Sequence, residues 1–509
     1  MLVRIFFLSL SLSFVAGVNA QDSSGRLQQS GQFQQQYTFY TADAAIQPLN
    51  PIANHARLIA GYGRTSGSYR LAQAAPVQQD IFFKTEGTRQ LGRYLLSGYF
   101  GYTHTLQDSV GYTLRYGIND PDPYYFYAYK KGNWQVGQYR LQAQVSRPFL
   151  NDKLLAGAGI RYQTVNAWRS NDPRPEQFNY HTDMEAGLHY RLSPRHSIGL
   201  GGSITSRKKE SSVQYRNKDY QLSMAYPEYV KRMQYGYGFE DRASNSELKN
   251  TGRGYGWQGV YQGKFRIGEV TAKGGYSYLG SDYKGDSTRY FPKGRYGSFY
   301  EDRWNAQFLW QYRRQQQAYM IEAVYIHHLG RDFNEFLQTN NYVYAFETIQ
   351  LRPCFQYYRD SVLQFELGLD LALTDLFRAD GNAGVVTDYQ YAEAAVQGAW
   401  YFSTGKKGWL KTGLTAGIRT AVSPVLTLPS QVSSFVQNVI IADYYYYDAT
   451  VFKAGVDLLY NRSVGENDGF VRMKLNYDQA QLSNHGLPGL WKPGQQRLYC
   501  EASIGITLR

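Results

Sequence analysis

Hydrophobic and polar residues alternate over unusually long stretches of this chain, and the clearest stretch is residues 180–192. Its sequence, YHTDMEAGLHYRL, puts apolar residues, tyrosine or threonine at every second position and charged residues, histidine or glycine between them. Because successive side chains of a β-strand point to opposite faces, this strand has one apolar and one polar face. Its length exceeds the usual strand of about 5–6 residues but suits a tilted bilayer crossing of about 9–11. The pattern predicts a transmembrane β-strand.

The same alternation recurs from about residue 90 to the C-terminus. Short connections follow every second strand and longer ones separate the pairs, which is typical of the periplasmic turns and extracellular loops of outer-membrane barrels. We therefore predict an all-β fold, a transmembrane antiparallel β-barrel of about 16 strands (14–18) in the cell outer membrane. The expected strands are residues 90–104, 135–147, 153–166, 179–192, 197–207, 253–266, 269–281, 302–313, 318–329, 344–358, 361–376, 387–402, 408–422, 446–460, 469–480 and 497–509.

Two of these strands carry details that a structure can test. In residues 363–373, Leu363 begins a predicted lipid-facing set, while Glu366 and Asp370 are expected to face the lumen. Pro353 interrupts the preceding strand, and because proline has no N–H to donate to the sheet, we expect a bulge there.

The chain before residue 90 divides into two parts. Residues 1–20, with Arg4, an apolar run and Val-Asn-Ala at the end, resemble a cleavable signal peptide; a retained transmembrane helix is the less favoured alternative because the apolar run is short. Residues 21–89 suit a periplasmic tail, an extra strand pair or a constriction inside the lumen. We favour partial insertion, since a barrel of this width otherwise leaves an aqueous channel. Residues 90–509 form the expected barrel.

The net charge indicates which partners to expect, and the positions of the cysteines indicate whether they form a disulfide. The formal net charge is +13, and because an exported protein rarely meets nucleic acid, we expect contact with the bilayer and with anionic lipopolysaccharide instead. Cys354 and Cys500 fall on opposite faces of the predicted wall, which disulfide geometry forbids, so two free thiols are expected.

The polar faces of the strands define the expected lumen. Basic and acidic residues are nearly balanced there, whereas a pore for one sign of charge would have a dominant ring of that sign. Balance favours ion pairs and a partly occluded lumen or a path for neutral solutes. The residues expected to line the lumen include Arg140, Arg161, Arg191, Arg303, Glu366, Asp370, Arg419 and Asp457.

One lumen-facing cluster could in principle do chemistry. His181, Asp183, Glu185 and His189 share a strand face, where same-face neighbours lie about 7 Å apart, close enough for acid–base work or metal binding. No partner nucleophile is evident in the sequence. We therefore expect a hydrated wall, no enzymatic activity, no metal and no cofactor.

Long tyrosine-rich loops support two functional hypotheses. Residues 124–127 read YYFY and residues 444–447 read YYYY, and such clusters stack on sugar rings or on partner surfaces. The first hypothesis is a barrel that passes or captures an unknown small solute. The alternative is a surface protein whose loops dock a partner lipoprotein or receptor barrel.

Two segments carry a resemblance to known proteins. Residues 83–87 (FKTEG) with residues 96–102 (LSGYFGY) resemble an uncharacterised outer-membrane β-barrel family of gram-negative bacteria. Residues 502–509 (ASIGITLR) resemble the terminal strand that the barrel-assembly machinery reads, although they end in Leu-Arg rather than in an aromatic residue. The resemblance implies a porin-like or transporter-like barrel and a biogenesis partner, and it transfers no functional residue.

Overall fold

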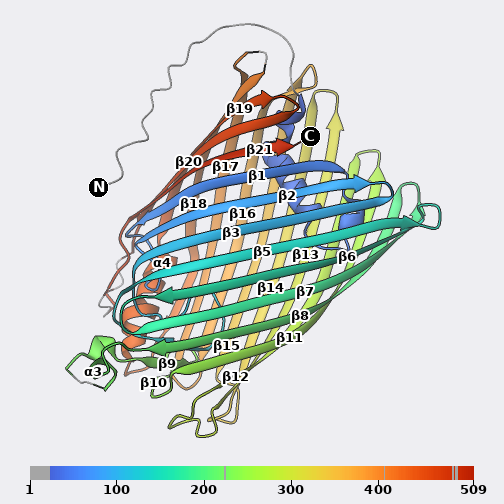
Figure 1. Cartoon of the computed structure of the whole chain (residues 1–509). Helices are drawn as coiled ribbons and strands as arrows, with labels where there is room; N and C mark the ends of the chain where they lie inside the picture. Colours follow the sequence, from blue (N-terminus) through green and yellow to red (C-terminus); the bar gives the residue numbers. More distant parts are fainter. Residues whose placement is uncertain (1–22, 223–224, 406, 484–485, 488–490, 509) are drawn as a thin grey trace.

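The structure, a computed structural model, describes residues 23–222, 225–405, 407–483, 486–487 and 491–508. The expected signal peptide lies outside these residues. The described chain forms a closed antiparallel barrel of 18 strands (Figure 1). The barrel closes because β1 (Asn54–Gly67) pairs with both β2 (Val77–Leu91) and the last strand, β21 (Gln496–Leu508).

Successive strands of the wall are neighbours in sequence. The other wall strands are β3 (Tyr94–Val110), β5 (Gly132–Phe149), β6 (Leu154–Arg169), β7 (Arg174–Ser193), β8 (His196–Gln214), β11 (Glu247–Phe265), β12 (Gly268–Gly285), β13 (Arg295–Arg314), β14 (Gln317–Asn334), β15 (Tyr342–Arg359), β16 (Val362–Asp380), β17 (Val385–Ser403), β18 (Gly408–Thr427), β19 (Thr450–Val464) and β20 (Asn467–Gln481).

The outer face of the wall is apolar. Leu188, Leu200, Ile204, Met473 and Ile504 are each more than half exposed on it, whereas their strand neighbours Glu185, His189 and Ser503 are buried on the inner face. Exposure of so many large apolar side chains is unfavourable in water and favourable in hydrocarbon. None of the helices in the described part of the chain is long and apolar enough to cross a membrane.

The barrel starts earlier than the sequence pattern indicated. We expected it to begin at residue 90, but β1 and β2 form the extra strand pair that residues 21–89 could supply. The 18 strands lie within the predicted range of 14–18. Their alternation is blurred because some inward positions are apolar. Ile59 packs against a buried apolar cluster inside the lumen, as Leu27 does, and the ring of Phe82 approaches Gly61.

Two details of the wall differ from prediction. Leu363 faces the lumen and is fully buried, not exposed to lipid, because a bulge between Tyr357 and Tyr358 shifts the register by one residue. The bulge expected at Pro353 is absent: the pairs on either side, Leu351 with Leu371 and Cys354 with Gly368, keep one register. Two residue pairs between β15 and β16 are missing there, because proline has no N–H to donate to the neighbouring strand. Both cysteines are free, as predicted.

Short turns join the strands at one end of the barrel, which marks that end as periplasmic. At the other end the strands extend beyond the predicted bounds, and the loops fold over the opening (Figure 1). These loops contain a small sheet of β4 (Tyr124–Tyr127), β9 (Arg232–Tyr235) and β10 (Glu240–Arg242), with α3 (Asp219–Leu222) and η2 (Pro227–Tyr229). They also contain the π-helix η3 (Val436–Ile440) and α4 (Ile441–Asp448). We call residues 68–76, 111–131, 215–246 and 428–449 together the loop cap.

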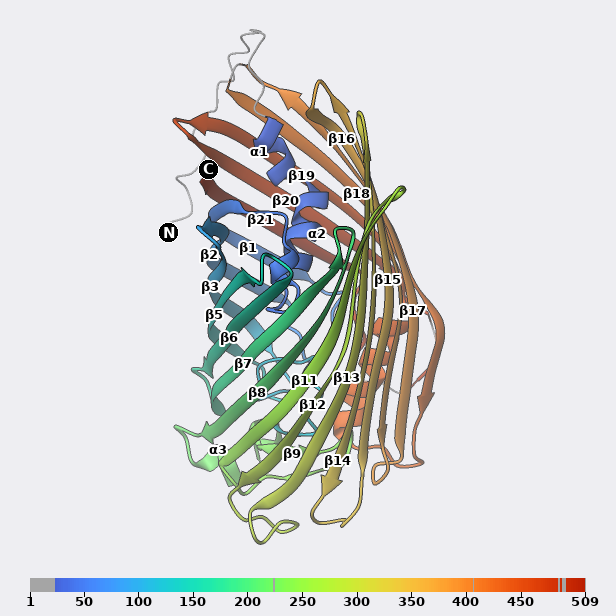
Figure 2. The ribbon, with the colours of Figure 1, turned by 90° about the vertical axis from the view of Figure 1, so that its right-hand side faces the viewer.

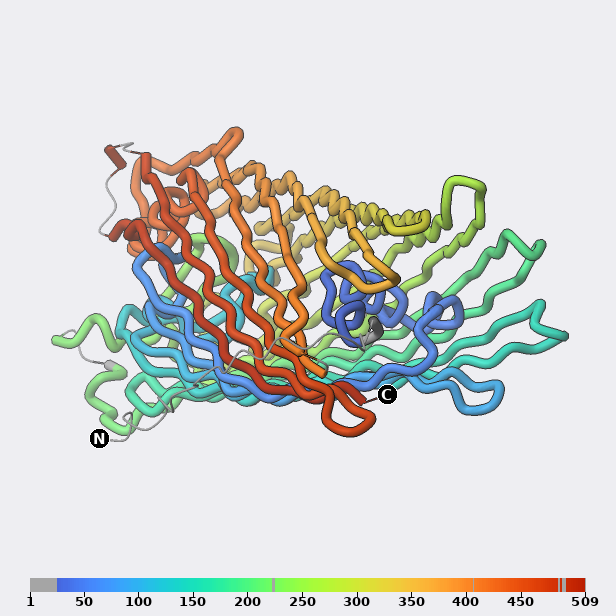
Figure 3. Tube along the Cα trace, turned by 90° about the horizontal axis from the view of Figure 1, so that it is seen from above, coloured from blue at the N-terminus to red at the C-terminus, as the bar shows by residue number. Residues whose placement is uncertain are grey.

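A second structure fills the barrel near its periplasmic end. Residues 23–50, which we call the N-terminal segment, form α1 (Ser23–Gln28), α2 (Gly31–Tyr40) and the 3-10 turn η1 (Gln47–Leu49). Ser30 caps α2 by accepting a hydrogen bond from the N–H of Phe33 at 3.1 Å. The strands surround α1 and α2 in Figure 2, and the segment coils inside the lumen when the barrel is seen from above (Figure 3).

Candidate functional site

The predicted histidine and carboxylate cluster is where the wall holds the N-terminal segment. Glu185 accepts a hydrogen bond from the N–H of Ala44 at 2.7 Å, and the ring of His189 contacts the carbonyl oxygen of Ala45. Arg161 pairs with Glu185 at 2.8 Å and with Asp183 at 3.5 Å. His181 contacts Asp183 at 3.1 Å. These groups mainly bind one another and the backbone of the segment, and Nδ1 of His189 is buried without a hydrogen-bond partner.

The cluster shows no arrangement for metal binding. Among the described residues, no group of three or more His, Cys, Asp or Glu side chains could hold a metal ion. The absence of an enzymatic activity and of a cofactor stays a prediction.

Further wall side chains contact the segment's backbone at the same level. Gln142 donates to the carbonyl of Thr41 at 2.6 Å, and Arg161 donates to that of Ala42 at 2.6 Å. In the opposite direction, the side chain of Gln47 donates to the wall carbonyl of Leu95 at 3.0 Å. Because these bonds engage backbone groups, they fix the path of residues 41–47 rather than single side chains.

Asp43 is the main ionic anchor of the segment. Its carboxylate pairs with Lys273 at 3.0 Å and accepts from Gln258 at 2.6 Å. It also accepts from the N–H groups of Ala45 and Ile46, which closes a tight turn. Burial alone would raise the pKa of Asp43, but Lys273 and the hydrogen bonds lower the pKa below its usual value.

Glu366 anchors the start of α2. Both of its carboxylate oxygens accept from the N–H of Gly31, at 3.0 and 3.1 Å, and Lys411 pairs with it at 3.1 Å. An anion at a helix N-terminus is favourable because the free N–H groups point toward it. Lys411 also lies 4.0 Å from Asp457, which Arg472 holds at 2.6 Å.

Arg26 fixes α1 to the periplasmic end of the wall. The side chain is buried, and it donates to the carbonyl oxygens of Leu363 at 3.0 Å and Tyr401 at 3.3 Å and to the hydroxyl of Ser403 at 2.5 Å. Leu363, which the bulge turns inward, is thus part of the contact between α1 and the wall.

Glycines on the inner wall leave room for the segment. A Cβ added at Gly157 would lie 2.3 Å from the carbonyl oxygen of Ala44, and one at Gly187 would lie 2.5 Å from the Cα of Ala45. At Gly201, a Cβ would lie 2.6 Å from the Cβ of Ala45. Only glycine permits such close backbone approach. The wall of β6, β7 and β8 is thus shaped to receive residues 44–45.

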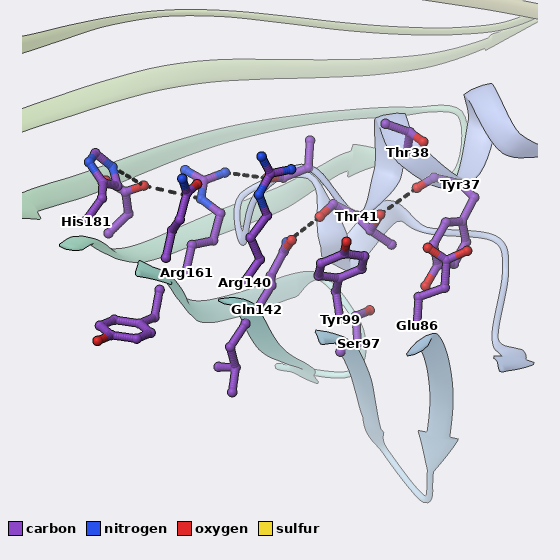
Figure 4. Close-up of a pocket in the computed structure, with 16 residues that line it drawn as sticks. Tyr37, Thr38, Thr41, Glu86, Ser97, Tyr99, Arg140, Gln142, Arg161 and His181 are labelled. Atoms are coloured by element: carbon purple, nitrogen blue, oxygen red, sulfur yellow. Dashed lines mark hydrogen bonds and ion pairs between the residues drawn. The ribbon is translucent and has the colours of Figure 1, made fainter. Parts of the chain in front are cut away.

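Cavities remain beside the segment. One, of about 510 Å³, lies between α2 and the wall strands β3, β5, β6 and β7, and we call it the chamber. Figure 4 shows Tyr99, Arg140, Arg161 and His181 around it, with Tyr37 on the α2 side. Two further cavities, of about 300 and 170 Å³, adjoin Asp43 and Glu366 respectively. The segment therefore narrows the lumen and leaves space for small polar molecules.

The remaining predicted lumen residues are dispersed along the barrel. Arg303 contacts Glu301 at 2.7 Å and His328 at 3.3 Å. Asp370 accepts from Gln350 at 2.8 Å. Arg419 lies under the loop cap and donates to the carbonyl of Tyr446 at 2.7 Å and to the hydroxyl of Tyr69. Arg191 is exposed at the periplasmic rim. The ion pairs run mostly between neighbouring strands along the wall.

Sequence reasoning missed the residues that make the segment fit. Asp43, Arg26 and the glycines were not singled out, because their roles depend on partners far away in the chain. The only local signal was that Gly157, Gly187 and Gly201 interrupt strands that otherwise favour larger residues.

Comparison with solved structures finds several barrels of low similarity. The barrel is similar to the ferric preacinetobactin receptor BauA of Acinetobacter baumannii (10% identity, TM-score 0.37, covering 91% of this chain and 84% of that one). It is also similar to the alcaligin outer-membrane receptor FauA of Bordetella pertussis (8% identity, TM-score 0.41, covering 89% of this chain and 76% of that one). A third similar structure is the FrpB iron transporter of Neisseria meningitidis (8% identity, TM-score 0.38, covering 90% of this chain and 81% of that one). No curated protein matches the sequence. Similarity of this size says nothing about a ligand.

A closed barrel with a lipid-facing apolar belt and a polar interior is an outer-membrane β-barrel, in contact with lipid and lipopolysaccharide. The model of a family of unknown function, DUF6850, matches residues 44–508. The chain belongs to this family.

Proposed function

We propose that this barrel passes a small polar solute across the outer membrane and that the N-terminal segment is its gate. The observation that carries the proposal is the way residues 41–47 are held. Wall side chains bind their backbone through hydrogen bonds, which water can replace at modest cost. One ion pair, between Lys273 and the carboxylate of Asp43, adds to them.

The chamber supports the same proposal. A volume of about 510 Å³ falls in the range of about 300–1,000 Å³ that is common for small-molecule sites. Its walls carry side chains of both charge signs, with Arg161 beside Asp183, which suits a neutral or zwitterionic polar solute more than a simple ion.

A reversible disulfide between the N-terminal segment and the wall, which we call the lock, tests whether the segment is the gate. A Cβ at Gly159 would lie 3.4 Å from the Cβ of Ala44, close to the disulfide spacing of about 3.5–4.5 Å. The side chain of Gln144, 2.9 Å from the new Cβ, would have to move aside. The double variant Ala44→Cys with Gly159→Cys, in a background with Cys354→Ala and Cys500→Ala, should therefore cross-link the segment to β6.

Glucose-driven swelling of liposomes and planar-bilayer conductance are the readouts. We expect the oxidised lock to pass much less than the same protein after reduction, and Ala44→Cys alone to be insensitive to oxidation. A variant lacking residues 23–50 should pass the most. Equal flux through the oxidised and reduced lock would refute the gate, and a barrel that stays silent without residues 23–50 would refute transport itself.

Docking of a partner protein by the loops stays a prediction. Its support is weaker than it was from sequence alone, because Tyr124, Tyr125 and Tyr127 are buried in the loop cap and offer no surface to a partner.

A further inference from the structure

A further polar cavity lies on the inner side of the loop cap, away from the N-terminal segment. It is lined by two arginines, Arg115 from the loop after β3 and Arg378 from the extracellular end of β16. Five tyrosine side chains surround them. These are Tyr125, Tyr237, Tyr342, Tyr389 and Tyr447. The cavity measures about 20 Å³, which is room for one or two groups the size of water.

Arg378 lacks the partner that a largely buried cation requires. Among the described residues, no carboxylate lies within 4.0 Å of its guanidinium, and its Nε is buried without a hydrogen-bond partner. Its guanidinium lies over the rings of Tyr237 and Tyr344, 5.3 and 5.6 Å from their centroids. Ring faces attract a cation but replace only part of its hydration.

Arg115 repeats the pattern. It is 8% exposed and stacks on the ring of Tyr125 at 3.7 Å. It donates one hydrogen bond, to the carbonyl oxygen of Asp122 at 2.9 Å, and its Nε has no partner. A neutral carbonyl does not balance its charge.

The carboxylates that border this cavity are engaged elsewhere. Asp120 and Asp122 both bind Lys209, Asp122 at 2.7 Å. Asp443 on α4 accepts from the N–H of Ala72 at 2.8 Å, and burial raises the pKa of Asp443 to about 7. Asp443 and Asp120 interact electrostatically with Arg378 and Arg115 respectively, but no carboxylate forms a salt bridge with either guanidinium among the described residues. The two arginines therefore present positive charge to a cavity whose acidic neighbours neutralise it only in part.

We propose that this cavity binds the carboxylate head of a ring-containing ligand, between Arg115 and Arg378. A guanidinium matches a carboxylate through two parallel N–H···O bonds, and the tyrosine rings provide faces for the ring of the ligand. The cavity takes the head group alone, so the ring must displace a loop side chain on entry. This site is independent of the proposed gate.

Calorimetry with the detergent-solubilised full barrel, in a buffer free of carboxylates, tests the site. The probes are sodium glucuronate against glucose and sodium benzoate against benzamide, which distinguish a sugar ring from an aromatic one. We expect at least one carboxylate to bind, its neutral counterpart not to bind, and Arg378→Gln to weaken binding at least tenfold. Arg331→Gln is the control, because Arg331 is exposed at the same end of the barrel. Binding by neither carboxylate, or binding unchanged in Arg378→Gln, overturns the proposal.

Thermal stability without ligand separates a ligand site from a structural role. If Arg378 only joins tyrosine rings, Arg378→Gln lowers the melting temperature of the cap. If Arg378 awaits an anion, removing its uncompensated charge leaves the melting temperature unchanged or raises it. Arg378→Lys keeps the charge but loses the two-pronged geometry, so we expect intermediate carboxylate binding from a barrel that folds normally.

Discussion

The N-terminal segment and the loop cap both fill the barrel, but different interactions hold them. The cap is joined to the extracellular ends of the strands by a large cluster of buried apolar side chains, most of them aromatic, which includes Phe126, Tyr127, Met233 and Phe435. The segment contributes a smaller cluster around Phe39 and Ile46. Wall side chains hold its backbone through hydrogen bonds and its Asp43 side chain through an ion pair.

This difference indicates which of the two can move as a unit. Displacing the cap would expose many aromatic rings to water, at a free-energy cost that grows with apolar area. Displacing the segment exposes fewer rings, and water can hydrate Asp43, Glu185 and Glu366 once their partners leave. We therefore expect the segment to open and the cap to stay folded.

The largest expected effect is on the cap. Phe126→Ala removes a ring that is 1% exposed and should lower the local stability of the cap by about 3–5 kcal/mol. Hydrogen exchange measured by mass spectrometry should accelerate in residues 111–131 and leave the N-terminal segment protected. Phe336→Ala, at a half-exposed ring, is the control. Equal acceleration in residues 23–50 would show that the two regions are one cooperative unit.

Glu366→Gln should release the N-terminal segment from the wall. Loss of this charge leaves Lys411 without its closest partner and weakens the contact with Gly31, at a cost of about 3 kcal/mol for a buried pair. Arg26 is the only trypsin site in residues 21–56, so faster cleavage there reports release of the segment. Asp360→Asn, at an exposed turn, should leave cleavage unchanged. Resistance of Glu366→Gln to trypsin would mean that the apolar contacts suffice.

Gly187→Leu should shift the segment by crowding. The new side chain would meet Ala45, and overpacking of this kind costs about 1–3 kcal/mol. We expect larger conductance and partial cleavage at Arg26 in a barrel of normal heat resistance. Gly259→Leu is the matched control, because an added Cβ there meets nothing within 4 Å. Equal effects from both substitutions would point to a general loss of the fold.

The smallest expected effect distinguishes the regions by pH. Burial raises the pKa of Asp443 to about 7, so the folded cap binds this proton more tightly than the unfolded chain does. Its contribution is fully present below about pH 4 and is lost as the pH rises through 7. Asp443→Asn should therefore stabilise the cap on the order of 1 kcal/mol at pH 8 and hardly at pH 4.

The contribution of Asp43 to stability depends on pH in the opposite direction. Its pKa is lowered in the folded state, so its contribution is present above about pH 4 and is lost as the pH falls below that value. Melting curves and trypsin cleavage at pH 3, 5 and 8 would show whether acid loosens the segment while base loosens the cap. A parallel response of both regions would contradict the comparison.

The sequence by itself determined the class of the protein. Strict two-residue alternation, as in residues 180–192, leaves one face for lipid and one for a polar interior, and only a closed barrel satisfies the backbone in hydrocarbon. The same parity placed Asp183, Glu366 and Asp457 on the inner face. These inferences hold because strand geometry couples neighbouring positions without any knowledge of distant contacts.

Only the tertiary structure decided what occupies the interior. Glu185 meets Ala44 across 141 residues of chain, and Arg26 meets Leu363 across 337. The parity of Leu363 depended on a bulge that leaves no reliable mark in its own strand. The first strand pair was hidden because the apolar Ile59 points inward and packs, like Leu27, against a buried cluster in the lumen. Such contacts follow from closing the sheet into a barrel around residues 23–50, and periodicity within a single strand carries no information about that closure.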